Sequence, residues 1–69
     1  MGMVVKGEGL IRLEAERLLL RRFRSEYDEF RAGSDHIEAV KALVVLRKRE
    51  YDACVREARA SLFGDQAAA

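Results

Sequence analysis

The sequence has one interior turn signal, formed by Gly33, Ser34 and Asp35, which separates two long stretches without proline. Gly33 is expected to take the left-handed conformation that commonly ends a helix. Asp35 followed by Glu38 has the spacing of a capping box, with Ser34 as an alternative N-cap residue. Because so short a turn makes neighbouring helices antiparallel, the pattern predicts an all-α fold built as an antiparallel two-helix hairpin.

The remaining glycines lie near the two ends of the chain and set the outer limits of this hairpin. The expected parts are a flexible or short extended N-terminal segment at 1–9, a helical hairpin at 10–63 and a frayed tail at 64–69. Within the hairpin, the expected elements are a first helix at about 10–32, a turn at 33–35 and a second helix at about 36–63.

Apolar residues recur along both helices with the alternating three- and four-residue spacing of a coiled-coil-like interface. Antiparallel pairing around the turn places Phe30 level with Ile37 and Tyr27 level with Val40. The residues predicted to form this interface between the two helices, called here the hairpin interface, are Leu13, Leu20, Phe23, Tyr27, Phe30, Ile37, Val40, Val44, Tyr51 and Cys54.

Each side of the hairpin interface also contains one charged residue, Glu16 in the first helix and Arg47 in the second. Antiparallel pairing brings the two within about one helical turn of each other. A lone buried charge destabilises a protein by several kcal/mol, so one interpretation is a buried ion pair that selects register or partner. In the alternative interpretation, Arg47 extends its charged end from the edge of the interface into solvent.

Both helices carry a second apolar stripe, which an isolated hairpin would leave exposed. A chain of 69 residues buries only a modest core by itself, so a partner is expected to cover this stripe. A two-fold homodimer would complete a four-helix bundle, and the alternative is a different protein that supplies the missing helices. The residues predicted to contact the partner are Ile11, Ala15, Leu18, Ala42, Val45, Leu46 and Ala53.

The composition offers little to catalysis or to metal binding. Cys54 and His36 are the single cysteine and the single histidine, so neither a disulfide within the chain nor a zinc-like ligand cluster is expected. Cys54 is interpreted as a small buried apolar residue and His36 as an exposed turn residue. No enzymatic activity, cofactor or small-molecule substrate is predicted.

A cytoplasmic location without membrane contact is expected for two reasons. The sequence lacks an apolar run of the roughly 20 residues that span a bilayer. A free, buried thiol also fits a reducing compartment.

Residues 17–24, RLLLRRFR, contain four arginines and no acid. On a helix, Arg17, Arg21 and Arg24 share the face opposite the hairpin interface, which makes them candidates for contact with nucleic acid. The alternative is an ordinary solvated face, because acids lie at helical pairing distance from three of the four arginines: Glu14 from Arg17, Glu26 from Arg22, and Asp28 from Arg24. The net charge of +1 supplies no overall field toward nucleic acid.

These features predict a small non-enzymatic protein–protein interaction module, acting as a homodimer in the role of a regulator, adaptor or inhibitor. Apolar anchors on a helix would provide the contact, and charged rims would orient it. Two alternatives remain at this point. One is a helical bundle that binds RNA or DNA through the arginine face, and the other is a structural subunit of a larger assembly.

Overall fold

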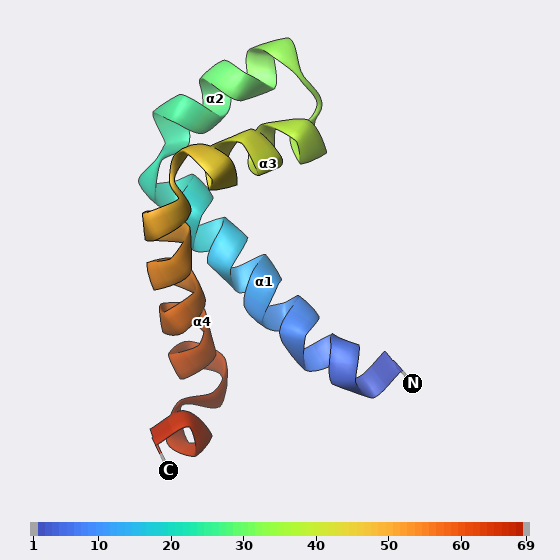
Figure 1. The fold of residues 1–69 in the computed structure, drawn as a ribbon, viewed down its shortest axis with the longest axis vertical. Coiled ribbons are helices and arrows are strands. Elements are labelled where there is room, and N and C mark those ends of the chain that lie inside the picture. Colours follow the sequence, from blue (N-terminus) through green and yellow to red (C-terminus); the bar gives the residue numbers. More distant parts are fainter. Residues whose placement is uncertain (1, 69) are drawn as a thin grey trace.

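The computed structural model describes residues 2–68 of the chain, with side-chain environments for residues 7–64. Over the described residues the chain is entirely helical and has no strand, which confirms the predicted all-α class. Four helices follow one another along the chain (Figure 1): α1 (Gly2–Arg22), α2 (Arg24–Gly33), α3 (His36–Leu46) and α4 (Lys48–Ala68).

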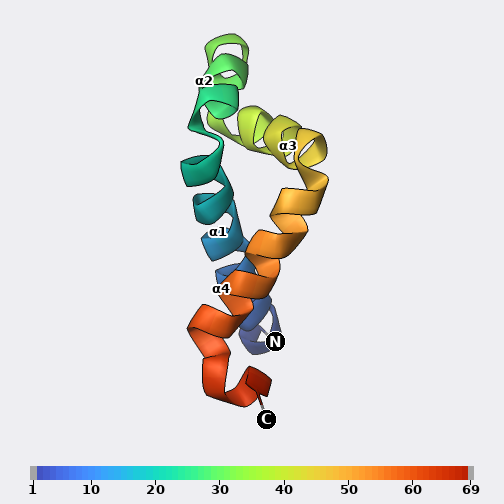
Figure 2. The ribbon, with the colours of Figure 1, turned by 90° about the vertical axis from the view of Figure 1, so that its left-hand side faces the viewer.

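The four helices pack as two pairs. The helices α2 and α3 lie against each other on either side of the interior turn, and α1 packs along α4 (Figures 1 and 2). The molecule measures 42 × 26 × 15 Å along its principal axes. Since packed helix axes lie about 8–10 Å apart, the thinnest direction admits no more than two helices side by side. Each helix therefore keeps at least one face that the chain itself does not cover.

The expectation of two uninterrupted long helices is wrong, because each is broken near its middle. Phe23 (φ −123°, ψ 49°) separates α1 from α2, and Arg47 (φ −113°, ψ 46°) separates α3 from α4. The two breaks face each other, with the Arg47 guanidinium carbon 4.5 Å from the centroid of the Phe23 ring. A cation over an aromatic face is attracted by the ring quadrupole, so this contact keeps the two breaks next to each other.

The ionic partner of Arg47 is Glu26, and not Glu16 as the sequence suggested. Arg47 Nη2 donates to Glu26 Oε2 at 2.8 Å, and about a third of each side chain is exposed. Arg47 Nε is buried and has no hydrogen-bond partner among the described residues. The break at Phe23 turns the start of α2 toward Arg47, whereas a straight helix would have presented Glu16.

The turn differs in one respect from its predicted form. Asp35 caps α3 as expected, because its Oδ1 accepts a hydrogen bond from the backbone N–H of Glu38 at 2.9 Å. Gly33, however, is the last helical residue of α2, and no glycine in residues 2–68 has a positive φ. The chain leaves α2 through Ser34 in an extended conformation (φ −152°, ψ 168°), which any residue can adopt.

Both chain ends are more helical than the sequence suggested. The predicted flexible or extended segment 1–9 belongs to α1 from Gly2 onward, and Met1 lies outside the described residues. An interior glycine disfavours a helix by about 1 kcal/mol relative to alanine, which weakens a helix without ending it. At the other end α4 continues to Ala68 through a kink at Phe63 (φ −132°, ψ 34°), whereas a frayed tail was expected.

The buried core is small and only partly overlaps the predicted hairpin interface. It consists of Ala15, Leu19, Tyr27, Ala39, Val40, Leu43, Cys54 and Ala58. The predicted residues Leu20, Phe23, Phe30, Val44 and Tyr51 are partly buried against it. Two predictions are wrong, because Leu13 is 59% exposed and Ile37 is 63% exposed.

The two largest fully buried side chains, Leu19 and Leu43, were absent from the predicted interface. In the observed packing, α1 directs Ala15 and Leu19 into the core, and Ala15 belongs to the stripe that was expected to face a partner. Ala15 is fully buried within the chain, so its predicted role as a partner contact is wrong.

Leu19→Ala and Leu13→Ala make the same change on one helix at a buried and an exposed position. Removing the Leu19 side chain leaves a cavity and is expected to lower the free energy of unfolding by about 2–5 kcal/mol. Leu13→Ala is expected to change it by about 0.5 kcal/mol or less. Urea denaturation followed by circular dichroism measures both, and equal losses would contradict the observed core.

Candidate functional site

The outer face of α3, the most apolar of the four helices, is left open by the described residues. Only His36, Glu38 and Lys41 in this helix are polar, yet α3 buries no more than Ala39, Val40 and Leu43. The remaining apolar residues point away from the core or along its edge, and Val45 is 78% exposed. A helix that is apolar on all sides is normally covered on all sides, so the open face of α3 lacks its expected covering.

Two shallow grooves run along either side of Val45. One has a volume of about 460 Å³ and is lined by Phe30, Glu38, Lys41, Ala42, Val45 and Leu46. The other, of about 470 Å³, lies where α3 meets α1 and α4, and is lined by Arg12, Glu16, Val40, Lys41, Val44, Val45 and Tyr51. Both combine an apolar floor with charged rims, the usual layout of a protein contact surface.

Tyr51 of α4 lines the second groove. Partial burial raises the pKa of the Tyr51 hydroxyl, and the nearby Glu16 carboxylate raises it further. Glu16 therefore lies on a groove wall and takes no part in the ion pair of Arg47.

The predicted partner contacts differ in exposure from helix to helix. On α3, Val45 and Leu46 are exposed and Ala42 is partly buried. On α1, Ile11 and Leu18 are partly buried against the chain's own core. The predicted residue of α4, Ala53, is also partly buried. The exposed part of the predicted surface therefore lies on α3.

The three candidate nucleic-acid residues lie together. Arg17, Arg21 and Arg24 line one open groove of about 270 Å³, with Glu14, Leu18 and Leu20 as the other lining residues. Arg17 lies 3.8 Å from Glu14, and Arg24 donates to Asp28 at 3.2 Å, as the helical spacing predicted. Local acids thus neutralise part of this basic face.

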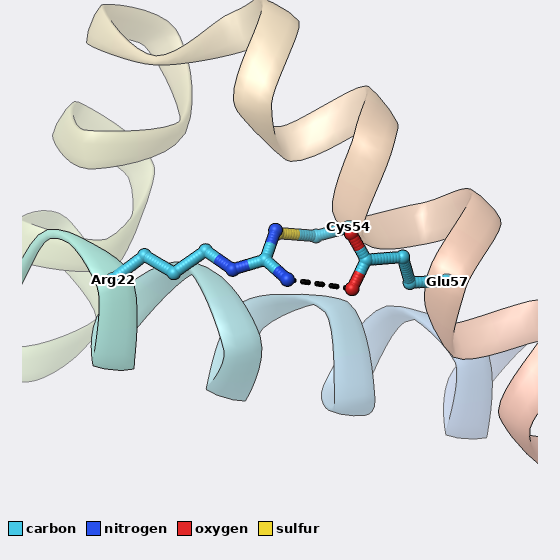
Figure 3. Close-up of polar contacts among 3 residues, drawn as sticks. All are labelled: Arg22, Cys54 and Glu57. Carbon is cyan, nitrogen blue, oxygen red and sulfur yellow. Dashed lines mark hydrogen bonds and ion pairs between the residues drawn. The ribbon is translucent and has the colours of Figure 1, made fainter.

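The fourth arginine of the stretch, Arg22, has a different partner from the predicted Glu26. It extends from the end of α1 to α4, where Nη2 donates to Glu57 Oε1 at 2.6 Å (Figure 3). Its Nη1 lies 3.5 Å from Cys54 Sγ. Glu57 and Cys54 are one helical turn apart on α4, so one guanidinium contacts both side chains and links α1 to α4.

This environment makes Cys54 a structural residue. Its side chain is fully buried, as predicted, and burial raises the pKa of the thiol despite the neighbouring guanidinium. Since the thiolate is the reactive form, an inaccessible thiol with a raised pKa is a poor nucleophile.

His36 is exposed, as predicted, but it also takes part in a contact across the interior turn. Tyr27 Oη and His36 Nδ1 share a hydrogen bond of 2.6 Å, and their rings meet edge to face with centroids 5.8 Å apart. The pair joins α2 to the first turn of α3. It therefore helps to orient α3 against α2.

Over the described residues, no three side chains of the metal-ligating types come together. None of the described helices is long and apolar enough to cross a membrane. No match to the chain was found among protein-family models, curated proteins or solved structures. Its function therefore has to be inferred from the chemistry of its own surface.

The roles of several residues that hold the helices together were not predicted from the sequence. Glu26 and Glu57 bind arginines far along the chain, and no local spacing reports such pairs. Leu19 and Leu43 did carry a signal, because each lies four residues after a buried alanine, Ala15 and Ala39. Neither leucine was assigned to an interface, and Ala15 was interpreted as a partner contact because unbroken helices were assumed.

Acid titration tests the two long-range ion pairs. Arg47 lowers the pKa of Glu26, and Arg22 lowers the pKa of Glu57, both below the ordinary value of 4.5. A lowered pKa means that the ionised form is favoured in the folded chain. The stabilisation is thus present above about pH 4.5 and lost as the pH falls through the lowered values.

Glu26→Gln is expected to lower the melting temperature at neutral pH and to reduce its further fall below pH 4.5. Glu16→Gln is the matched control and is expected to change neither, because Glu16 is not the partner of Arg47. Melting curves followed by circular dichroism between neutral and acid pH measure both variants. A larger effect of Glu16→Gln would contradict the observed pairing.

Proposed function

We propose that this chain is a small non-enzymatic protein–protein interaction module, which acts as a homodimer in the role of a regulator, adaptor or inhibitor. The observation that carries the proposal is the open apolar face of α3, with Val45 at its centre. Contiguous exposed apolar surface on a small protein generally marks a contact site.

The dimensions of the chain support the need for a partner. Its thinnest dimension is 15 Å, so each helix keeps an uncovered face, and the buried core of the described residues consists of eight side chains. A second copy would cover such faces without requiring any other protein.

In this proposal, α1 with α2 and α3 with α4 act as the two broken helices of an antiparallel hairpin. Two copies then form a four-helix bundle in which each of the four helices is broken once. Apolar side chains of α3 provide the contact area, and charged groove residues such as Glu38 and Lys41 orient the partner. The buried free thiol of Cys54 supports a cytoplasmic location, where thiols remain reduced.

The purified chain is expected to sediment with twice the mass of one 7.8-kDa chain at micromolar concentration. Val45→Asp places a charge on the open face of α3 and is expected to shift the protein toward monomer. Leu62→Asp is the matched control, since Leu62 is also exposed but lies near the far end of α4. A folded wild-type monomer throughout this range would overturn the proposal.

The shared groove of Arg17, Arg21 and Arg24 favours a second candidate function, the binding of RNA or DNA. Binding through these arginines would weaken steeply as salt rises, because each phosphate contact releases a counterion. A gel shift at low salt that disappears on replacing all three by alanine supports this candidate. Absence of any shift at low salt rules it out.

A third candidate, a structural subunit of a larger assembly, makes a different prediction. It requires the chain to be recovered from its host as part of one complex of constant composition. Recovery as a free dimer would contradict it.

A further inference from the structure

The outer face of α3 carries one charge of each sign. Glu38 and Lys41 line the same groove as Ala42 and Val45. Neither charged side chain has an ion-pair partner within residues 7–64, whereas Arg22, Arg24 and Arg47 are paired. Two unpaired opposite charges beside an open apolar strip form a pattern that a partner surface can complement.

The order of these charges distinguishes the two ways in which a second α3 could lie along the first. A parallel arrangement about a two-fold axis places each residue next to its own copy, so Glu38 would meet Glu38 and Lys41 would meet Lys41. An antiparallel arrangement exchanges the residues on either side of a midpoint. With the midpoint between Ala39 and Val40, Glu38 of each copy lies level with Lys41 of the other.

We propose that α3 binds α3 of a second copy of this chain in antiparallel orientation, through two reciprocal Glu38–Lys41 ion pairs. This inference rests on the proposed homodimer and assigns its interface. A two-fold interface must be self-complementary, so a residue that contacts another must receive the same contact in return. The outer face of α3 meets that condition within a single turn of helix.

Charge exchange tests the pairing. Glu38→Lys alone and Lys41→Glu alone each place two like-charge pairs in the interface and are each expected to weaken dimerisation at least about tenfold. The double variant restores both pairs in reversed order and is expected to recover dimerisation. Sedimentation equilibrium measures the dissociation constants, and circular dichroism confirms that each variant keeps its helical content.

Mixing the two single variants provides a second readout. Glu38→Lys presents two lysines and Lys41→Glu presents two glutamates, so an equimolar mixture is expected to form the heterodimer in preference to either homodimer. Native mass spectrometry distinguishes the three species if one variant carries a mass tag. Glu29→Lys and Arg56→Glu make the same charge changes at exposed positions of α2 and α4, and their mixture is expected to show no preference.

The outcomes separate the inference from the proposed function. A monomeric wild-type chain overturns both the homodimer and its interface. A wild-type dimer that single charge changes leave intact, or that the double variant fails to restore, overturns the α3 pairing and leaves the homodimer standing. Weakening by each single variant, recovery in the double variant and selective heterodimer formation together establish the pairing.

Discussion

The contact between Arg47 and Phe23 joins the two breaks that divide the chain into four helices. Both residues occupy breaks in otherwise helical stretches, and the guanidinium of one lies over the ring of the other. A partly buried arginine requires compensation for its lost hydration, which the aromatic face and the Glu26 carboxylate provide together. Without this contact, the two amphipathic stretches would be free to pack as straight helices around a continuous interface.

The breaks redistribute the apolar residues between the inside and the outside of the molecule. They bring Leu19 and Leu43 into the core and leave Leu13 and Ile37 at the surface. They also leave α3, the most apolar helix, with one of its faces covered and the other open. The exposed face of α3, on which the proposed homodimer rests, thus accompanies the same breaks that shape the core. A partner that binds α3 would complete a core that the single chain builds only in part.

Whether a feature could be predicted from the sequence depends on how far apart along the chain the interacting residues lie. Asp35 capping α3, and Arg24 pairing with Asp28, depend on residues three or four positions apart, and both were predicted correctly. The partners of Arg22 and Arg47 lie on other helices, so their identity depends on how those helices cross. The exposed residues Val45 and Leu46 were predicted to meet a partner and remain accessible. Ala15 was predicted to do so as well, but the shifted packing of α1 buries it.

The sequence by itself determined the all-helical class, the position of the interior turn and the excess of apolar surface, because these depend on local spacing and composition. Only the tertiary structure decided where the helices break and which apolar stripe faces inward. Neither break occurs at proline or glycine, so no local propensity marks it. At the breaks, Phe23, Arg47 and Glu26 make contacts that exist only after distant parts of the chain have come together.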